Sequence, residues 1–358
     1  MKYIKELDSL RALAILCVIF AHWAPNSTLN IIPWGGIGVH FFFVLSGFLI
    51  TKILLESSLK AETEKISRAA VVKNFYIRRT LRIFPIYYLT ILIVFIFRQY
   101  AEVDFRDSLV YYLTYTPNFY FFKTGSWEGQ LSHLWSLGVE EQFYLIWPWI
   151  IIFINKKYLR VVIIAFILFG ILSEYIFDSL PLGTVLPNTC FDGFGLGALL
   201  AWQVIFRKDS IAKCYLWISI LAAIAFLLFA SIFIFPGMPV LVPLRFLTFL
   251  IGVWILTYVM LYAETDRLKF KFIFHNRVLI FLGKISYGIY LYHFIIPKLL
   301  NTNLINKYIN PKLPDILYKA YFGWLFFLEN FIMLILISWF SYKFIERPFL
   351  DLKKHFTT

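Results

Sequence analysis

Ten apolar segments, each close to the length of a membrane-crossing helix, constrain this chain more than any other feature of its sequence. The hydrocarbon core of a bilayer is about 30 Å thick and takes a helix of roughly 20 residues. The segments predict an all-α polytopic membrane protein, a bundle of about ten transmembrane helices. They cover residues 9–24, 36–55, 82–98, 134–154, 160–177, 190–206, 214–235, 243–263, 278–300 and 323–345.

Composition excludes the main alternatives to a membrane protein. Hydrophobic residues make up 60% of the 358 residues and charged residues 15%, against about 25% charged residues in an ordinary soluble domain. A soluble globule cannot bury so much apolar surface, and a disordered chain needs low hydrophobicity. The net charge of +13 would suit a nucleic-acid binder. The basic residues lie between the apolar segments, however, so we expect a lipid bilayer and no nucleic acid as partner.

The distribution of lysine and arginine predicts the orientation of the helices. With the N-terminus in the cytoplasm, cytoplasmic segments carry 24 of the 34 basic residues, the opposite segments carry 7 and 3 lie within helices. Cytoplasmic loops usually hold such an excess, so we expect both termini in the cytoplasm and an even number of helices. A cleaved signal peptide is the alternative for the first segment, but Glu6, Asp8 and Arg11 interrupt its basic start.

Residues 1–358 are expected to form a single membrane-embedded domain. The apolar segments continue to residue 345, and the motif Glu346-Arg347-Pro348 predicts the end of the last helix. We therefore expect no appended soluble domain. The sequence carries no signal for an oligomeric state.

Ionisable side chains within the apolar segments are the best guide to function, because each is costly in a membrane unless it is paired or hydrated. Arg11 and His22 are eleven residues apart, so they lie on one helix face about 16 Å from each other along the axis. Arg11 is then near the cytoplasmic end and His22 near the outer end. A snorkelling arginine and an interfacial histidine are an equally good interpretation of this pair.

Arginines precede the third apolar segment. Arg79 and Arg82 are expected at the cytoplasmic start of that helix, where the helix dipole and the guanidinium donors favour an anionic ligand such as a coenzyme diphosphate. Ordinary positive-inside charge is the alternative, and we favour it for Arg78. Arg82 lies deeper in the apolar pattern and is the better functional candidate.

Two adjacent carboxylates, Glu140 and Glu141, enter the fourth apolar segment at the expected level of His22. On a helix they point about 100° apart, so only one can face a given site. A carboxylate that orients an imidazole is a standard general-base arrangement. The alternative is a buried carboxylate that satisfies an arginine elsewhere in the bundle.

A polar face also occurs on the ninth apolar segment. Ser286, Tyr290 and His293 fall at positions i, i+4 and i+7 and must face the bundle interior or a cavity. His40 in the second segment is a similar but weaker candidate. The six histidines lack metal-ligand spacing, and no nucleophile elbow or phosphate loop is present, so no metal site is expected.

These motifs, in this order over nearly the whole chain, resemble the acyltransferase-3 family of integral membrane O-acyltransferases. The resemblance rests on Arg11 with His22, Gly38-Val39-His40 with the run 42–50, Arg79-x-x-Arg82, Trp135 to Tyr144, Ser286 to His293 and Glu346-Arg347-Pro348. His40 departs from the pattern, because many members carry aspartate there. An acidic role at that position is therefore not expected. Some members append an extracellular hydrolase-like domain.

The resemblance implies transfer of an acyl group, which we expect to be acetyl, from cytoplasmic acyl-CoA to a hydroxyl of a sugar or surface glycan. It implies an integral protein of the bacterial inner membrane. Acyl-CoA would dock at Arg79 and Arg82, with Arg11 near the CoA or the thioester. His22 would deprotonate the acceptor, with Glu140 or Glu141 holding its imidazole. The expected acceptor-binding or charge-stabilising residues are His293, Tyr290, Ser286 and His40.

Three mechanistic alternatives remain at this stage. A covalent acyl-enzyme on Ser46 or Ser286 is disfavoured, because neither serine shows an adjacent base in the sequence. A transporter of a small anionic or glycosidic solute would also carry intramembrane charges, but paired repeats are typical of transporters and none is convincing here. A non-catalytic acyl-CoA sensor would bind the donor without turnover.

Overall fold

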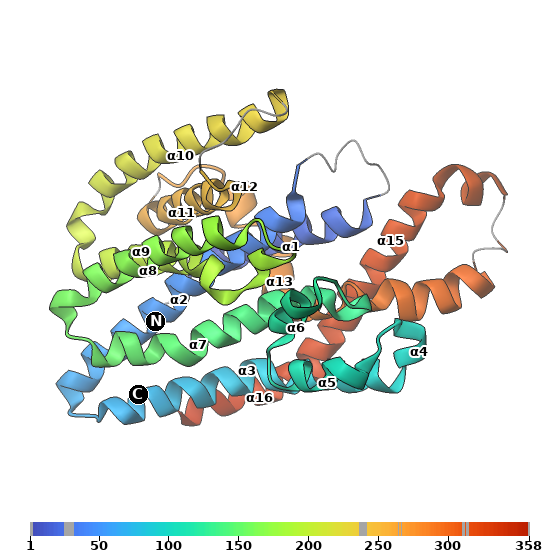
Figure 1. The fold of residues 1–358 in the computed structure, drawn as a ribbon, viewed down its shortest axis with the longest axis horizontal. Coiled ribbons are helices and arrows are strands. Elements are labelled where there is room, and N and C mark those ends of the chain that lie inside the picture. The colour runs from blue at the N-terminus through green and yellow to red at the C-terminus, as the bar shows by residue number, and fades with distance from the viewer. Residues whose placement is uncertain are drawn as a thin grey trace.

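Long helices that run side by side make up the fold (Figure 1). The computed structural model describes residues 3–24, 32–235, 242–263, 265, 267–309, 312 and 315–356. These residues form helices and turns without a β-strand, which confirms the all-α class. The long helices are α1 (Lys5–Trp23), α2 (Trp34–Glu64), α3 (Arg68–Ile96), α7 (Trp135–Phe153), α8 (Lys156–Phe177), α9 (Phe191–Phe206), α10 (Ile211–Ile234), α11 (Leu244–Tyr262) and α15 (Asp315–Ser341).

Short helices connect the long ones. The segment between α3 and α7 contains α4 (Arg98–Ala101), α5 (Phe105–Leu113), α6 (Pro117–Thr124) and η2 (Gly129–Leu134). The other short elements are η3 (Gly183–Val185), η4 (Pro187–Cys190), η5 (Lys208–Ser210), α12 (Lys271–Phe274), α13 (Arg277–Lys284), α14 (Ser286–Tyr292), η6 (Pro297–Ile309), η8 (Tyr342–Glu346), α16 (Arg347–Leu352) and η9 (Lys353–His355).

Seven helices within the described ranges are long and apolar enough to cross a membrane. Helices α2, α3, α8 and α11 meet this criterion alone, and α9, α10 and α15 meet it together with adjoining short segments. This supports an integral membrane protein. The marked chain ends lie at the same end of the bundle, on the left in Figure 1, where α2 turns into α3 and α7 turns into α8.

Helix α2 is the centre of the packing. It contacts α1, α7, α9 and α11, and its contact with α9 is the most extensive in the molecule. A Cβ added at Gly47 would lie 2.0 Å from the carbonyl oxygen of Phe194, and one added at Gly197 would lie 2.0 Å from that of Val44. The two helices therefore touch backbone to backbone, which only glycine allows at these positions.

Helix α3 begins earlier than the apolar pattern indicates. The Ser67 hydroxyl caps it by accepting a hydrogen bond from the backbone N–H of Ala70 at 3.2 Å. Val71, Val72 and Phe75 are buried, so this stretch packs as an amphipathic helix. The arginines from Arg78 onward consequently lie about three turns into α3. The expectation that the N-terminal helix dipole assists them is wrong.

The expected helix over 278–300 is divided into α13 and α14, which meet at Ile285. Helix α13 lies against α1 so closely that a Cβ at Gly283 would be 1.9 Å from the carbonyl oxygen of Asp8. After α14, Pro297, which has no N–H to donate, opens the π-helical segment η6. The prediction of one continuous helix here is wrong.

The helical path also continues past Glu346, where the last helix was expected to end. Pro348 lies in the first turn of α16, a position at which proline is tolerated because that N–H has no partner in the helix. Helix α16 and segment η9 pack against α3. The C-terminal segment therefore returns to the arginine-bearing helix.

Candidate active site

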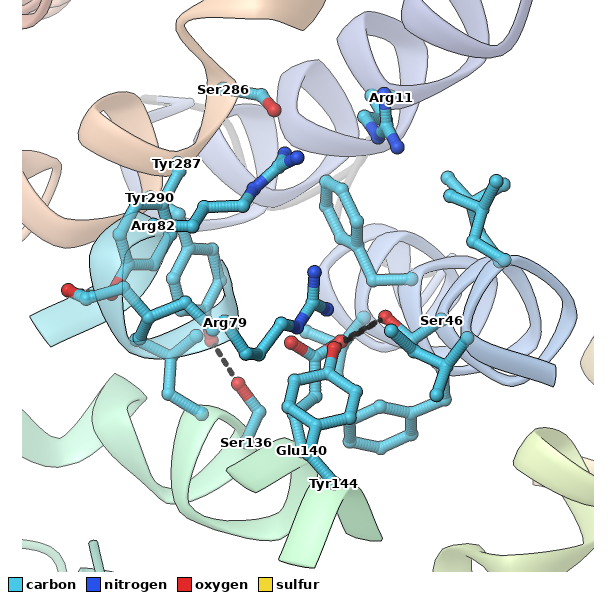
Figure 2. Close-up of a pocket in the computed structure, with 18 of the residues that line it drawn as sticks. Arg11, Ser46, Arg79, Arg82, Ser136, Glu140, Tyr144, Ser286, Tyr287 and Tyr290 are labelled. Carbon is cyan, nitrogen blue, oxygen red and sulfur yellow. Dashed lines mark hydrogen bonds between the residues drawn. The ribbon is translucent and has the colours of Figure 1, made fainter. Parts of the chain in front are cut away.

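A cavity of about 200 Å³ lies between α1, α2, α3, α7 and α14. We call it the arginine cavity, because the guanidinium groups of Arg11, Arg79 and Arg82 point toward its centre in Figure 2. Arg11 forms an ion pair with Asp8 at 2.5 Å, whereas Arg79 and Arg82 have no such partner among the described carboxylates. The cavity is therefore suited to an anion.

Glu140 is the one carboxylate that lines the arginine cavity within the described ranges. It accepts a hydrogen bond from the Ser46 hydroxyl at 2.7 Å, and the Tyr144 hydroxyl donates to the same Ser46 oxygen at 3.0 Å. The Arg79 guanidinium lies 4.1 Å from the centre of the Tyr144 ring. The expectation that Ser46 has no adjacent base is thus wrong, because α2 and α7 bring Glu140 to it.

Glu141 does not line the arginine cavity. It interacts electrostatically with Arg79 and with several tyrosines around α3. The two carboxylates diverge because successive residues on a helix point about 100° apart.

A second cavity, of about 470 Å³, carries three histidines, His22, His40 and His133. We call it the histidine cavity. Its other polar or aromatic lining residues are Trp127, Ser132, Trp135, Thr184, Arg245, Tyr290 and Phe294. Glycines Gly35 and Gly36 complete the wall on α2. Glycine has no side chain, so these two residues leave the histidine rings accessible from the cavity.

The ring of His22 is held by His293. His22 Nδ1 and His293 Nε2 are 3.1 Å apart, and the two rings stack with centroids 5.1 Å apart. His293 Nδ1 lies 2.6 Å from the carbonyl oxygen of Tyr290. The sequence suggested Glu140 or Glu141 as the partner of His22, but both carboxylates lie deeper along α7 than the histidine cavity.

These contacts define which nitrogen of His22 is free to take up a proton. A carbonyl oxygen only accepts, so His293 donates from Nδ1, and neutral His293 accepts at Nε2. His22 must then donate from Nδ1, which leaves its lone pair on Nε2. That nitrogen faces Gly35, where an added Cβ would be 3.9 Å away, at the wall of the histidine cavity.

His40 and Arg245 also line the histidine cavity. His40 Nδ1 lies 2.6 Å from the Thr248 hydroxyl, which itself donates to the Arg245 carbonyl oxygen at 2.7 Å. The Arg245 guanidinium donates to the carbonyl oxygens of Thr184 and Thr189 at 2.8 and 3.1 Å and forms an ion pair with Glu174 at 3.7 Å. Arg245 therefore fixes the η3–η4 segment that closes this side.

The two cavities meet at Val39 and Tyr290, which line both. The Tyr290 hydroxyl lies 2.5 Å from Ser136 Oγ and donates to the His133 carbonyl oxygen at 2.9 Å. A third cavity, which we call the cationic mouth, shares Ile50, Ile53, Arg79 and Arg82 with the arginine cavity. The three cavities thus follow one another along α2.

Most of the residues singled out from the sequence line one of these cavities. Arg11, Arg79, Arg82, Glu140, Ser286 and Tyr290 line the arginine cavity, whereas His22 and His40 line the histidine cavity. His293 is fully buried behind His22. Sequence reasoning missed Tyr144, His133 and Lys353. Tyr144 is one helical turn from Glu140, a signal that was available.

Comparison with known proteins identifies the family. The family model described as an acyltransferase domain, Acyl_transf_3, matches residues 4–345. The peptidoglycan O-acetyltransferase OatA of Listeria monocytogenes is 31% identical over 82% of this chain and 49% of its own length. The O-acetyltransferase OatA of Staphylococcus aureus strain NCTC 8325 is 26% identical over 97% of this chain and 57% of its own length.

A putative O-acetyltransferase of Staphylococcus aureus strain COL is 27% identical over 98% of this chain and 58% of its own length. The chain thus spans about half the length of the curated relatives it matches. No solved structure matches it. Because the family match covers nearly the whole chain, the chain belongs to the acyltransferase-3 family.

Proposed function

We propose that this protein is a membrane O-acyltransferase that moves an acetyl group from cytoplasmic acetyl-CoA to a hydroxyl of a sugar or surface glycan. The observation that carries the proposal is the row of cavities along α2, with unpaired arginines in one cavity and a proton-accepting histidine in the next. The names of the relatives, which include peptidoglycan O-acetyltransferases, support a glycan acceptor.

The proposed topology has ten membrane crossings and both termini in the cytoplasm of a bacterial inner membrane. The excess of basic residues in the segments on the side of the termini supports this orientation. The cationic mouth and the arginine cavity then face the cytoplasm, where acyl-CoA is made. The histidine cavity faces outward, toward a surface glycan.

In the proposed reaction Arg79 and Arg82 bind the donor, and Arg11 supports the CoA end of its pantetheine arm. Arg11 and His22 are about 16 Å apart along α1, a separation of the same order as an extended pantetheine arm. The arm can therefore run through the arginine cavity past Val39 and Tyr290. It carries the thioester toward His22.

His22 Nε2 then removes the proton from the acceptor hydroxyl. The resulting oxygen nucleophile attacks the thioester carbonyl carbon, the new C–O ester bond forms, and the C–S bond breaks. The thiolate of CoA leaves and takes up the proton from the imidazolium of His22. His293 keeps the His22 ring in the tautomer that accepts at Nε2, and Trp127 and His133 line the space for the acceptor.

Direct transfer is favoured over an acyl-enzyme on Ser46, although Glu140 lies beside that serine. Ser46 is ten residues along α2 from Gly36 in the wall of the histidine cavity, which corresponds to about 15 Å. An acetyl group on Ser46 would be that far from the level of His22. A bound pantetheine arm spans this distance, whereas a serine side chain does not.

Thiol release from acetyl-CoA by the purified protein in nanodiscs tests the proposal. We expect release that depends on added envelope glycan, and His22→Ala should lower it roughly 10²–10⁴-fold, the usual contribution of a general base. His275→Gln is the control, since His275 pairs with Glu6 outside all three cavities. Normal turnover by His22→Ala would exclude His22 as the base. Donor binding without thiol release would instead indicate an acyl-CoA sensor.

A further inference from the structure

The cationic mouth contains four cations and no carboxylate of the described residues. Arg78, Arg79 and Arg82 come from α3, and Lys353 comes from η9 at the C-terminal end. The remaining lining residues are Ile50, Ile53, Leu54, Ser57, Val71, Asn74 and Phe75. None of the four cations forms an ion pair with a described carboxylate.

Four positive charges around one cavity repel one another, and the repulsion is stronger where protein replaces water. The Arg79 Nε atom is buried and has no hydrogen-bond partner, a costly state for a donor. A multiply charged anion would relieve both costs at once. Phosphate groups fit best, because guanidinium and ammonium groups bind their oxygens through charge-assisted hydrogen bonds.

The side chains of Lys353 and its neighbour Lys354 point in different directions. Lys354 is exposed and forms an ion pair with Asp351 at 2.9 Å, whereas Lys353 is half-buried and lines the mouth. The difference arises because η9 packs against α3, so only one of two successive side chains can point toward the arginines.

We propose that Lys353 is a phosphate-binding residue of the donor site, which holds the nucleotide end of acyl-CoA together with Arg78. The proposal rests on the proposed function and extends it to the C-terminal segment. Arg78 and Lys353 line the mouth but not the arginine cavity. Of the four cations of the mouth, these two therefore lie farthest from His22. The phosphates of acyl-CoA lie at the end opposite to the thioester.

Binding of CoA to the purified protein in nanodiscs tests this assignment, with adenosine 3′,5′-bisphosphate as a competitor that lacks the pantetheine arm. Lys353→Gln should weaken both ligands by the same factor, on the order of tenfold, the usual size of one lost charged hydrogen bond. Lys354→Gln is the matched control and should leave both affinities unchanged. Lys353→Arg retains the charge and should retain most of the binding.

Several results would overturn the assignment. Unchanged affinities in Lys353→Gln, while the wild-type protein binds CoA, would remove Lys353 from the site and leave the proposed function intact. Weaker binding of CoA alone would place Lys353 against the pantetheine arm instead of a phosphate. Failure of the wild-type protein to bind CoA would overturn the proposed donor and, with it, this assignment.

Discussion

The pair formed by His22 and His293 is the most specific arrangement at the scale of single residues. The sequence suggests that His293 binds the acceptor or stabilises the developing charge, whereas its contacts suggest that it positions His22. Acceptor binding and positioning of His22 predict different kinetics. A substrate-binding residue changes KM, and a residue that fixes the tautomer of a base changes kcat.

We therefore expect His293→Ala to lower kcat for acetyl transfer by roughly 10²-fold, within the range of general-base effects, with little change in the KM for acetyl-CoA. His293→Gln keeps a side-chain carbonyl that can accept from His22 Nδ1, so it should recover part of kcat. Steady-state kinetics in nanodiscs measures both constants. A raised acceptor KM at normal kcat would instead support the substrate-binding role.

The sequence predicted which charged residues line the arginine cavity better than it predicted which residues contact one another. Arg11, Arg79, Arg82 and Glu140 could be named because a charge in an apolar segment stands out by its cost. The partner of His22 could not be named, since it depends on how α14 packs against α1. Lys353 was missed because a lysine in a segment that is expected to be cytoplasmic looks like ordinary positive-inside charge.

At the scale of elements, the close contact with α9 fixes the position of α2, which lines all three cavities. Gly47→Ala places a Cβ against the Phe194 carbonyl oxygen, so either α2 or α9 must shift to make room for it. We expect the free energy of unfolding to fall by about 1–3 kcal/mol, the usual cost of overpacking. A lower Tm in detergent would show this change.

Gly252→Ala on α11 is the matched control for this substitution. Its Cβ would meet only the Phe41 and Val44 side chains, at 3.4 and 3.7 Å, which are ordinary contact distances. Alanine also favours a helix over glycine, so the Tm of this variant should stay the same or rise slightly. Equal Tm values for the two variants would contradict the backbone contact.

Helix existence was predictable, but helix ends and breaks were not. Apolar length identifies α2, α8 and α11, because a membrane helix needs about 20 apolar residues. The early start of α3 depends on an amphipathic stretch that precedes the apolar segment. The break at Ile285 depends on the fit of Gly283 against α1, a tertiary contact that hydropathy does not report.

At the scale of the whole molecule, the proposed reaction requires the cationic mouth and the histidine cavity to face opposite sides of the membrane. Two exposed lysines report on these sides. Lys65 lies in the turn between α2 and α3, beyond the end of α2 that bears the mouth residue Ser57. Lys123 lies in α6, which precedes Trp127 of the histidine cavity. The proposed topology puts Lys65 in the cytoplasm and Lys123 outside.

Cysteine labelling with a membrane-impermeant maleimide checks this topology. The variants Lys65→Cys and Lys123→Cys are compared in a background whose native cysteines, Cys17, Cys190 and Cys214, are replaced by alanine. We expect Lys123→Cys to react in intact cells and Lys65→Cys to react only after permeabilisation, because the reagent cannot cross the bilayer. The opposite labelling pattern would mean that the cationic mouth faces away from the cytoplasm. Cytoplasmic acyl-CoA could then not be the donor.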